Sequence, residues 1–76
     1  LHNIDAEVFE FEVLPGAKVT KAIISELNFP RDAVFGGIIR NGKALISDGD
    51  FQVMSGDKVI VFCLPEAIHI VEDLFR

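Results

Sequence analysis

The sequence predicts a small α+β sandwich: a mixed, mostly antiparallel β-sheet with two helices, in the order β-α-β-β-β-α. Three observations support this class. Residues 7–14 alternate between acidic and apolar side chains, Asn41-Gly42 lies between Ile-rich flanks, and residues 58–64 form a nearly unbroken apolar run. The first pattern is typical of a half-buried strand, the second of a hairpin turn, and the third of a central strand.

The first predicted strand covers residues 7–14. Successive side chains of a strand point to opposite faces, so its apolar and acidic residues separate. The two sets are Phe9, Phe11 and Val13 on one face, and Glu10 and Glu12 on the other. We expect the apolar face to contact the core and the acidic face to be solvated.

A short helix is predicted over residues 19–28, after Pro15-Gly16 has ended the strand. Apolar side chains recur there at the spacing of a helix that buries one face. They are Val19, Ala22, Ile23 and Leu27. Asn28-Phe29-Pro30 is expected to end this helix, because Asn tolerates the left-handed conformation and Pro cannot continue a helix.

A hairpin is predicted around Asn41-Gly42, since both central residues of a type I′ turn need positive φ. A two-residue turn also determines the register of the strands. Arg40 then faces Lys43, Ile39 faces Ala44, and Ile38 faces Leu45. The incoming strand covers residues 34–40.

Alternation divides this hairpin into two faces. We assign one face to the core, and it comprises Phe35, Ile39, Ala44 and Ile46. The other face comprises Ile38, Arg40, Lys43, Leu45 and Ser47. This second face combines apolar side chains with two cations, so we expect another surface to cover it or to bridge its charges.

Residues 58–64 are predicted to form a central strand buried on both faces, with Ile60 in the core. Pro65 suits the first position of a second helix, and Glu66 lies near the positive end of that helix. The expected buried stripe of this helix is Ala67, Ile68, Val71, Leu74 and Phe75.

Length and composition limit what the chain does. The 76 residues form one domain, expected over 7–76 after a linker or frayed lead-in at 1–6. Half of the residues are apolar, which predicts an oligomer interface or a larger parent protein. A net charge of −5 argues against nucleic acid and anionic lipid as partners. No apolar run reaches the roughly 20 residues of a membrane span.

The motifs of catalysis and metal binding are missing. There is no Gly-rich phosphate loop, no His-x-x-x-His and no Cys pair, and Asp48-Gly49-Asp50 lacks the later ligands of a calcium loop. Cys63 reads as a small buried apolar residue, and a lone cysteine favours an intracellular, reducing compartment. We therefore predict no enzyme activity, no metal and no cofactor in this domain.

Arg40 and Lys43 meet at the predicted hairpin tip. One interpretation is an anion or phosphate site, in which Arg supplies planar donors and Lys a point charge. The other is a solvated tip without a ligand. The candidate ligand-binding residues are Ile38, Arg40, Asn41, Lys43 and Leu45.

The arrangement resembles the TrkA C-terminal domain family, also called the RCK C-lobe, over about residues 7–75. The acidic-apolar strand, the segment Glu26-Leu27-Asn28-Phe29-Pro30 and the Asn41-Gly42 hairpin carry the resemblance. Its most specific part is the stretch from Asp48 to Phe62, in which Gly-Asp occurs twice before an apolar strand. The tail is similar to bacterial Trk-system potassium uptake regulators in particular.

This resemblance implies a cytoplasmic regulatory domain that pairs with another copy and serves a membrane-embedded potassium transporter subunit through its parent. It implies that NAD or ATP binds only to a Rossmann domain elsewhere in the parent, since the fingerprint of that domain is absent here. Some members of the family bind cyclic di-adenosine monophosphate between paired copies, so a cyclic dinucleotide or another small anion is a possible partner.

Two alternatives remain open on the sequence. The chain could be a purely structural dimerisation module without ligand, or a regulatory insert of an anion symporter or antiporter. In the leading hypothesis it forms a two-fold homodimer through apolar surface of the hairpin face or of the last helix, and the paired Arg40 and Lys43 clusters attract an anion.

Overall fold

The computed structural model describes residues 5–76, so most of the lead-in expected over 1–6 lies outside the described residues. Four strands form one sheet in the order β1-β4-β2-β3, and all three neighbouring pairs are antiparallel. The strands are β1 (Glu7–Glu12), β2 (Ala33–Arg40), β3 (Lys43–Leu45) and β4 (Lys58–Cys63). The α+β class is confirmed, with a wholly antiparallel sheet.

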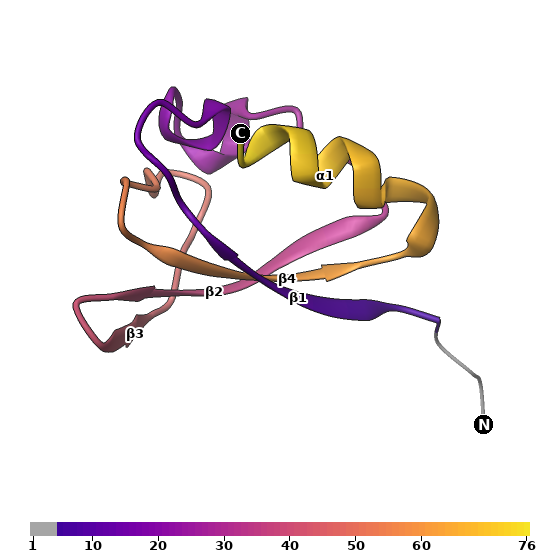
Figure 1. The fold of residues 1–76 in the computed structure, drawn as a ribbon, viewed down its shortest axis with the longest axis horizontal. Coiled ribbons are helices and arrows are strands. Elements are labelled where there is room, and N and C mark those ends of the chain that lie inside the picture. The colour runs from indigo at the N-terminus through magenta and orange to yellow at the C-terminus, as the bar shows by residue number, and fades with distance from the viewer. Residues whose placement is uncertain (1–4) are drawn as a thin grey trace.

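The helical segments lie on one face of the sheet (Figure 1). They are the 3₁₀ turns η1 (Lys18–Thr20), η2 (Ile24–Glu26) and η3 (Pro65–Ala67), and the α-helix α1 (Ile68–Leu74). The core lies between these segments and the sheet. Its fully buried side chains include Val13, Val19, Ile38, Val53, Val59, Val61 and Val71.

The first strand and the last helix agree with the prediction. In β1, Phe9 and Phe11 are half-buried while the two glutamates between and beyond them are exposed. Pro65 begins η3, which continues into α1, and Ala67, Val71 and Phe75 are buried. The Phe11 and Phe75 rings stack, with 4.3 Å between their centroids, so β1 and the end of α1 pack directly together.

The helix predicted over residues 19–28 is wrong. Two 3₁₀ turns replace it, separated by Ile23 in an extended conformation (ψ 158°). The amides of Ile24 and Ser25 donate hydrogen bonds to the carbonyl oxygens of Phe51 and Gly49. Because these amides bond to a distant loop, an α-helical ladder does not form. The expected stop is present, since Asn28 has φ 52°.

The hairpin has the predicted turn and register. Asn41 and Gly42 have φ values of 52° and 78°, and Arg40, Ile39 and Ile38 pair with Lys43, Ala44 and Leu45. Positive φ at both central residues is the geometry of the type I′ turn that joins twisted antiparallel strands.

The predicted faces of the hairpin are inverted beyond Gly36, whereas Phe35, which precedes it, packs against the core as predicted. A β-bulge lies between Phe35 and Gly37 in the pairing of β2 with β4, so Gly36 is one extra residue and reverses the alternation after it. Ile38 is therefore in the core at 1% exposure, whereas Ile39 is half-buried on the opposite face. Ile46, also assigned to the core, is fully exposed.

Strand β4 is central, as predicted, but only one of its faces is covered. Val59, Val61 and Cys63 are buried beneath the helical segments. On the other face Ile60 is half-buried and Phe62 is 45% exposed, so the expected burial of both faces, with Ile60 in the core, is wrong for this chain. Within residues 5–76, no helix has the length and apolar character that a membrane crossing requires.

The bulge makes Ile38 and Ile39 unequal in burial. Truncating each side chain to alanine tests this difference. We expect Ile38→Ala to lower the free energy of unfolding by about 2–5 kcal/mol, because it leaves a cavity in the core. Ile39→Ala should cost about 1 kcal/mol, since its side chain keeps water contact. Urea unfolding followed by circular dichroism measures both. Equal losses, or a larger loss for Ile39→Ala, would contradict the bulge.

Candidate functional site

The five predicted ligand-binding residues do not share one surface. Ile38 is in the core, and Leu45, opposite it, is half-buried. Asn41 and Lys43 are exposed at the hairpin tip, and Arg40 is partly buried beside them. The structure thus brings the three polar residues together and separates Ile38 from any ligand.

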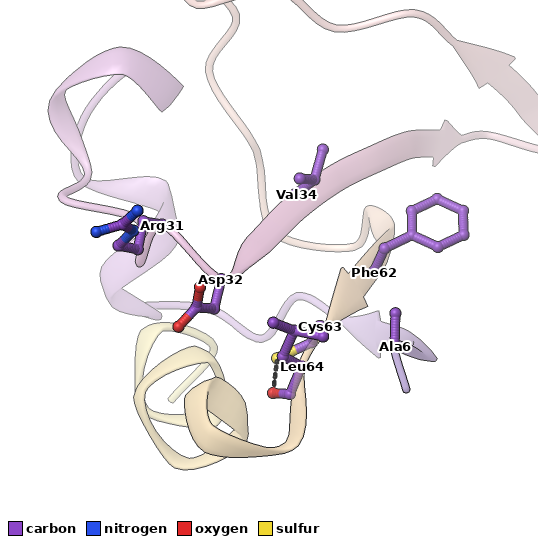
Figure 2. A pocket seen from close by; sticks show the side chains of 7 residues that line it. All are labelled: Ala6, Arg31, Asp32, Val34, Phe62, Cys63 and Leu64. Atoms are coloured by element: carbon purple, nitrogen blue, oxygen red, sulfur yellow. Dashed lines mark hydrogen bonds between the residues drawn. The ribbon is translucent and has the colours of Figure 1, made fainter. Parts of the chain in front are cut away.

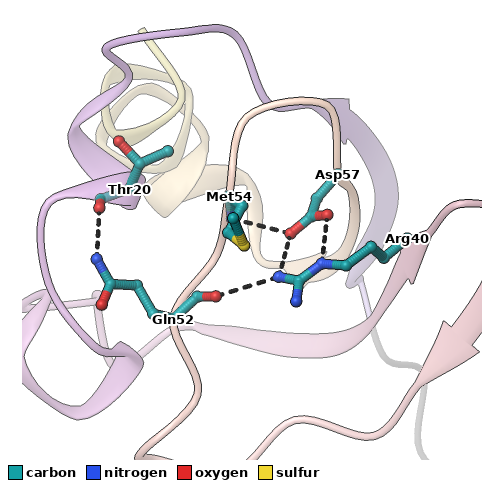
Figure 3. A network of polar contacts seen from close by, with 5 residues as sticks. All are labelled: Thr20, Arg40, Gln52, Met54 and Asp57. Atoms are coloured by element: carbon teal, nitrogen blue, oxygen red, sulfur yellow. Dashed lines mark hydrogen bonds and ion pairs between the residues drawn. The ribbon is translucent and has the colours of Figure 1, made fainter.

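Arg40 forms a bidentate ion pair with Asp57 (Figure 3). Its Nε donates to Asp57 Oδ1 at 2.9 Å, and its Nη2 donates to Oδ2 at 2.8 Å. The Nη2 atom also donates to the carbonyl oxygen of Gln52 at 3.2 Å, and the guanidinium lies 4.9 Å from the centre of the Phe51 ring. Arg40 therefore joins the end of β2 to the loop that precedes β4.

Asp57 is built into a tight turn. Its backbone N–H donates to the Met54 carbonyl oxygen, and its Oδ2 accepts a hydrogen bond from the Met54 N–H at 2.9 Å. Gly56 has φ 90°, which a type II turn requires at its third residue. Val13 pairs with this turn through its N–H and its carbonyl oxygen, so the turn also fastens the end of β1.

The ion pair explains the electrostatics of the tip. Asp57 is 2% exposed, and its hydrogen bonds with Arg40 outweigh burial and lower the pKa of its carboxyl group. The same hydrogen bonds raise the pKa of Arg40. Because Asp57 neutralises Arg40, the anion attraction expected of the tip depends on Lys43, which is exposed.

The face of the sheet away from α1 is a second surface, which we call the open face. In Figure 1 no element covers it within residues 5–76. Alternation on either side of the bulge places an apolar set and a charged set there. The apolar set is Val8, Val34, Ile39, Ile60 and Phe62, and the charged set is Glu10, Glu12 and Lys58.

A hollow of about 240 Å³ lies at one end of the open face (Figure 2). Its walls include Ala6, Val34, Phe62 and Leu64, with Arg31 and Asp32 at one side. The hollow therefore offers apolar walls with one cation and one carboxylate at the side, and its lining carries no net charge. The sequence contained a signal for this surface, because Gly36-Gly37 inside a strand indicates a bulge.

Cys63 borders this hollow but is 1% exposed, as predicted for a buried apolar residue. Its Sγ donates to the carbonyl oxygen of Leu64 at 3.2 Å. Burial, followed by the nearby acidic side chains, raises the pKa of the thiol, which disfavours the nucleophilic thiolate. Across residues 5–76, no group of three or more His, Cys, Asp or Glu side chains could hold a metal ion.

The Arg40–Asp57 pair makes stability depend on pH. Because folding lowers the pKa of Asp57, the pair stabilises the chain above the unfolded value of about 3.9 and loses this effect as pH falls through the folded value. Asp57→Asn should lower the free energy of unfolding at pH 7 by about 2–4 kcal/mol, since Arg40 loses its ionic partner.

The difference from the wild type should shrink as pH falls below about 4, where Asp57 becomes protonated first in the unfolded chain and then, at its lowered pKa, in the folded chain. Urea unfolding at several pH values measures it, and the exposed Asp50→Asn is the matched control, expected to change stability little at any pH. A deficit of Asp57→Asn that stays constant down to about pH 2 would contradict the assignment.

Comparison with known proteins places these features in a family. Residues 8–76 match the TrkA-C domain family. The chain is 31% identical over 71 residues to Trk system potassium uptake protein TrkA homolog 2 of Methanosarcina mazei. This match covers 93% of the chain and 16% of the relative. It is 30% identical over 70 residues to Trk system potassium uptake protein TrkA of Azorhizobium caulinodans, covering 92% of this chain and 15% of the relative.

A solved structure has the same fold. It is described as "Structure of RCK domain with cda", and it superposes with a TM-score of 0.76 at 26% sequence identity. The match covers 91% of this chain and 97% of the solved one. The chain thus spans about one sixth of the length of the curated relatives, and almost the whole of the solved RCK domain. The family match over residues 8–76, together with the shared fold, shows that this chain belongs to the TrkA-C (RCK C-lobe) domain family.

Proposed function

We propose that the chain is a regulatory and dimerisation domain of a potassium uptake system. The match to the TrkA-C family over residues 8–76 is the observation that carries this proposal. The names of relatives from M. mazei and A. caulinodans, both Trk system potassium uptake proteins, support the transported ion. The domain would act in the cytoplasm, and the parent would bring it to a membrane-embedded transporter subunit.

The domain would regulate by a change in the arrangement of two paired copies, and not by catalysing a reaction. A ligand that binds one arrangement of two paired copies more tightly than another shifts the population toward that arrangement. The attached parts of the parent would receive the change, and any NAD or ATP would bind to a Rossmann domain there. No role as an enzyme and no cofactor of its own is proposed for this domain.

We further propose a small anionic or nucleotide effector, such as a cyclic dinucleotide, bound between paired copies. The related RCK domain described "with cda" supports a ligand in this fold. In this chain, Lys43 and Asn41 at the exposed hairpin tip would contact the anion, and two-fold pairing would double the positive charge. Leu45 would border the contact, whereas Ile38 supports it only from the core.

A structural dimerisation module without ligand is the competing function. The bidentate Arg40–Asp57 pair favours the module without ligand, because Asp57 neutralises one of the two cations predicted to attract an anion. A regulatory insert of an anion symporter or antiporter would differ in the flanking sequence, where membrane spans replace the Gly-x-Gly-x-x-Gly unit of a Rossmann domain.

Dimerisation is tested by the mass of the chain in solution. At tens of micromolar, on the order of common interface affinities, we expect light scattering to give twice the monomer mass of 8.4 kDa. The mass should fall to the monomer on dilution, because association follows mass action. A monomer throughout this range would refute the dimerisation part of the proposal.

The effector is tested by thermal stabilisation with a panel of cyclic dinucleotides, mononucleotides and inorganic phosphate. A ligand that binds only the folded state raises the melting temperature, by an amount that grows with its concentration. We expect Lys43→Ala to abolish most of this rise, and Lys21→Ala, which removes another exposed lysine, to keep it.

Two results would change the interpretation. A rise that survives Lys43→Ala but is lost in Arg31→Ala would move the effector to the hollow on the open face. No rise with any compound at millimolar concentration, which corresponds to about −4 kcal/mol of binding free energy, would favour the structural module.

A further inference from the structure

We propose that Asn41 is a site of spontaneous deamidation, and that this reaction cancels the positive charge of the hairpin tip. The reaction needs no enzyme and no partner protein, since its only co-reactant is water. Its effect on ligand binding rests on the effector proposed above, whereas the reaction itself does not depend on any ligand.

The chemistry uses the peptide nitrogen that follows an asparagine. This nitrogen attacks the side-chain amide carbon Cγ, the new C–N bond closes a succinimide ring, and the side-chain nitrogen leaves as ammonia. Water then opens the ring at either of its carbonyl groups. Opening at one carbonyl gives aspartate, and opening at the other gives isoaspartate, in which the main chain passes through the side-chain carbon. In both cases an amide and water become a carboxylic acid and ammonia, without any change in oxidation state.

Asn41 is followed by glycine, the residue that favours this attack. Gly42 has no side chain to shield its nitrogen, and apart from its chain neighbours no heavy atom lies within 4 Å of the place that a Cβ would take. Both residues are exposed, and their turn projects from the body of the domain in Figure 1. Among residues 5–76, no side-chain hydrogen bond holds the Asn41 amide. The attacking nitrogen and the amide carbon are thus both accessible.

Asn28 provides a contrast within the same chain. It has the same φ of 52° as Asn41 and is also exposed, so neither φ nor solvent access separates the two. Asn28 precedes Phe29, whose large side chain shields the peptide nitrogen and packs on Phe35 with 4.5 Å between the ring centroids. We therefore expect Asn28 to persist while Asn41 reacts.

A carboxylate in place of the Asn41 amide would change the electrostatics of the tip. Arg40 is already paired with Asp57 through two hydrogen bonds, so the attraction for an anion depends on the exposed Lys43. The new carboxylate would lie between Arg40 and Lys43 in the chain and would offset the Lys43 charge. The net charge of the chain would change from −5 to −6, by the gain of one negative charge.

The isoaspartate product would also disturb the turn. A two-residue turn determines the register of a hairpin, and Asn41-Gly42 keeps Arg40 opposite Lys43. Isoaspartate adds a carbon atom to the main chain of this turn. Because β3 comprises only Lys43–Leu45, few pairs hold it in place, and we expect this edge strand to pair less well in the isoaspartate form.

The experiment incubates the purified chain at mildly acidic and mildly alkaline pH and samples it over days. Isoelectric focusing follows the added negative charge, and mass spectrometry of proteolytic peptides assigns it to a residue. We expect Asn41 to convert, and faster at alkaline pH because the deprotonated peptide nitrogen is the nucleophile. Asn41→Gly is the matched control, since Gly-Gly also forms a type I′ turn but carries no amide, so its charge should not shift.

A short peptide that spans Ile38 to Leu45 is incubated in parallel. If Asn41 of the folded chain is still intact when most of the peptide has converted, the turn holds the nitrogen away from Cγ and the proposal is overturned. Equal conversion of Asn28 and Asn41 would contradict the role given to Gly42.

The effect on binding is tested with Asn41→Asp, which supplies the aspartate product directly. The thermal stabilisation that cyclic dinucleotides or inorganic phosphate give to the fresh chain should be mostly lost in this variant and in the aged chain. An unchanged rise in Asn41→Asp would overturn the effect on binding. If the fresh chain shows no rise with any compound, the proposed effector fails, while the charge and mass measurements still decide the deamidation.

Discussion

The bidentate ion pair between Arg40 and Asp57 is the contact on which the arrangement of this small domain depends. It joins the end of β2 to the turn before β4, while the same turn pairs with Val13 at the end of β1. Three strands are thereby fastened at one end of the sheet. In a domain of 76 residues, whose core is small, such a contact amounts to a large share of the net stability.

The ion pair also influences the other side of the molecule. By holding Phe51 and Gln52 near Arg40, it positions the loop whose carbonyl oxygens accept the amides of Ile24 and Ser25. The segment before β2 then satisfies its backbone through this loop and forms two 3₁₀ turns. A residue first considered for ligand binding therefore has a structural role, which leaves Lys43 as the exposed cation of the tip.

The surfaces of this domain carry its functional information, since a fold by itself does not specify a function. The open face combines exposed apolar side chains with charges of both signs, and the hollow at its end lies beside Arg31. Membership of the TrkA-C family supports a regulatory role for this domain. In the proposed dimer, an effector between the copies would act by favouring one relative orientation of the two.

Local chemistry determined much of this fold from the sequence. The alternation in β1, the positive φ of Asn41 and Gly42, the hairpin register and the start of the last helix at Pro65 each depend on near neighbours, and each was predictable. Tertiary structure decided the rest. Contacts with the 49–51 loop replaced a helix, and one extra residue at Gly36 exchanged Ile39 for Ile38 in the core. Because a strand's side chains repeat every two residues, a single bulge reverses every assignment beyond it, and with it the predicted site.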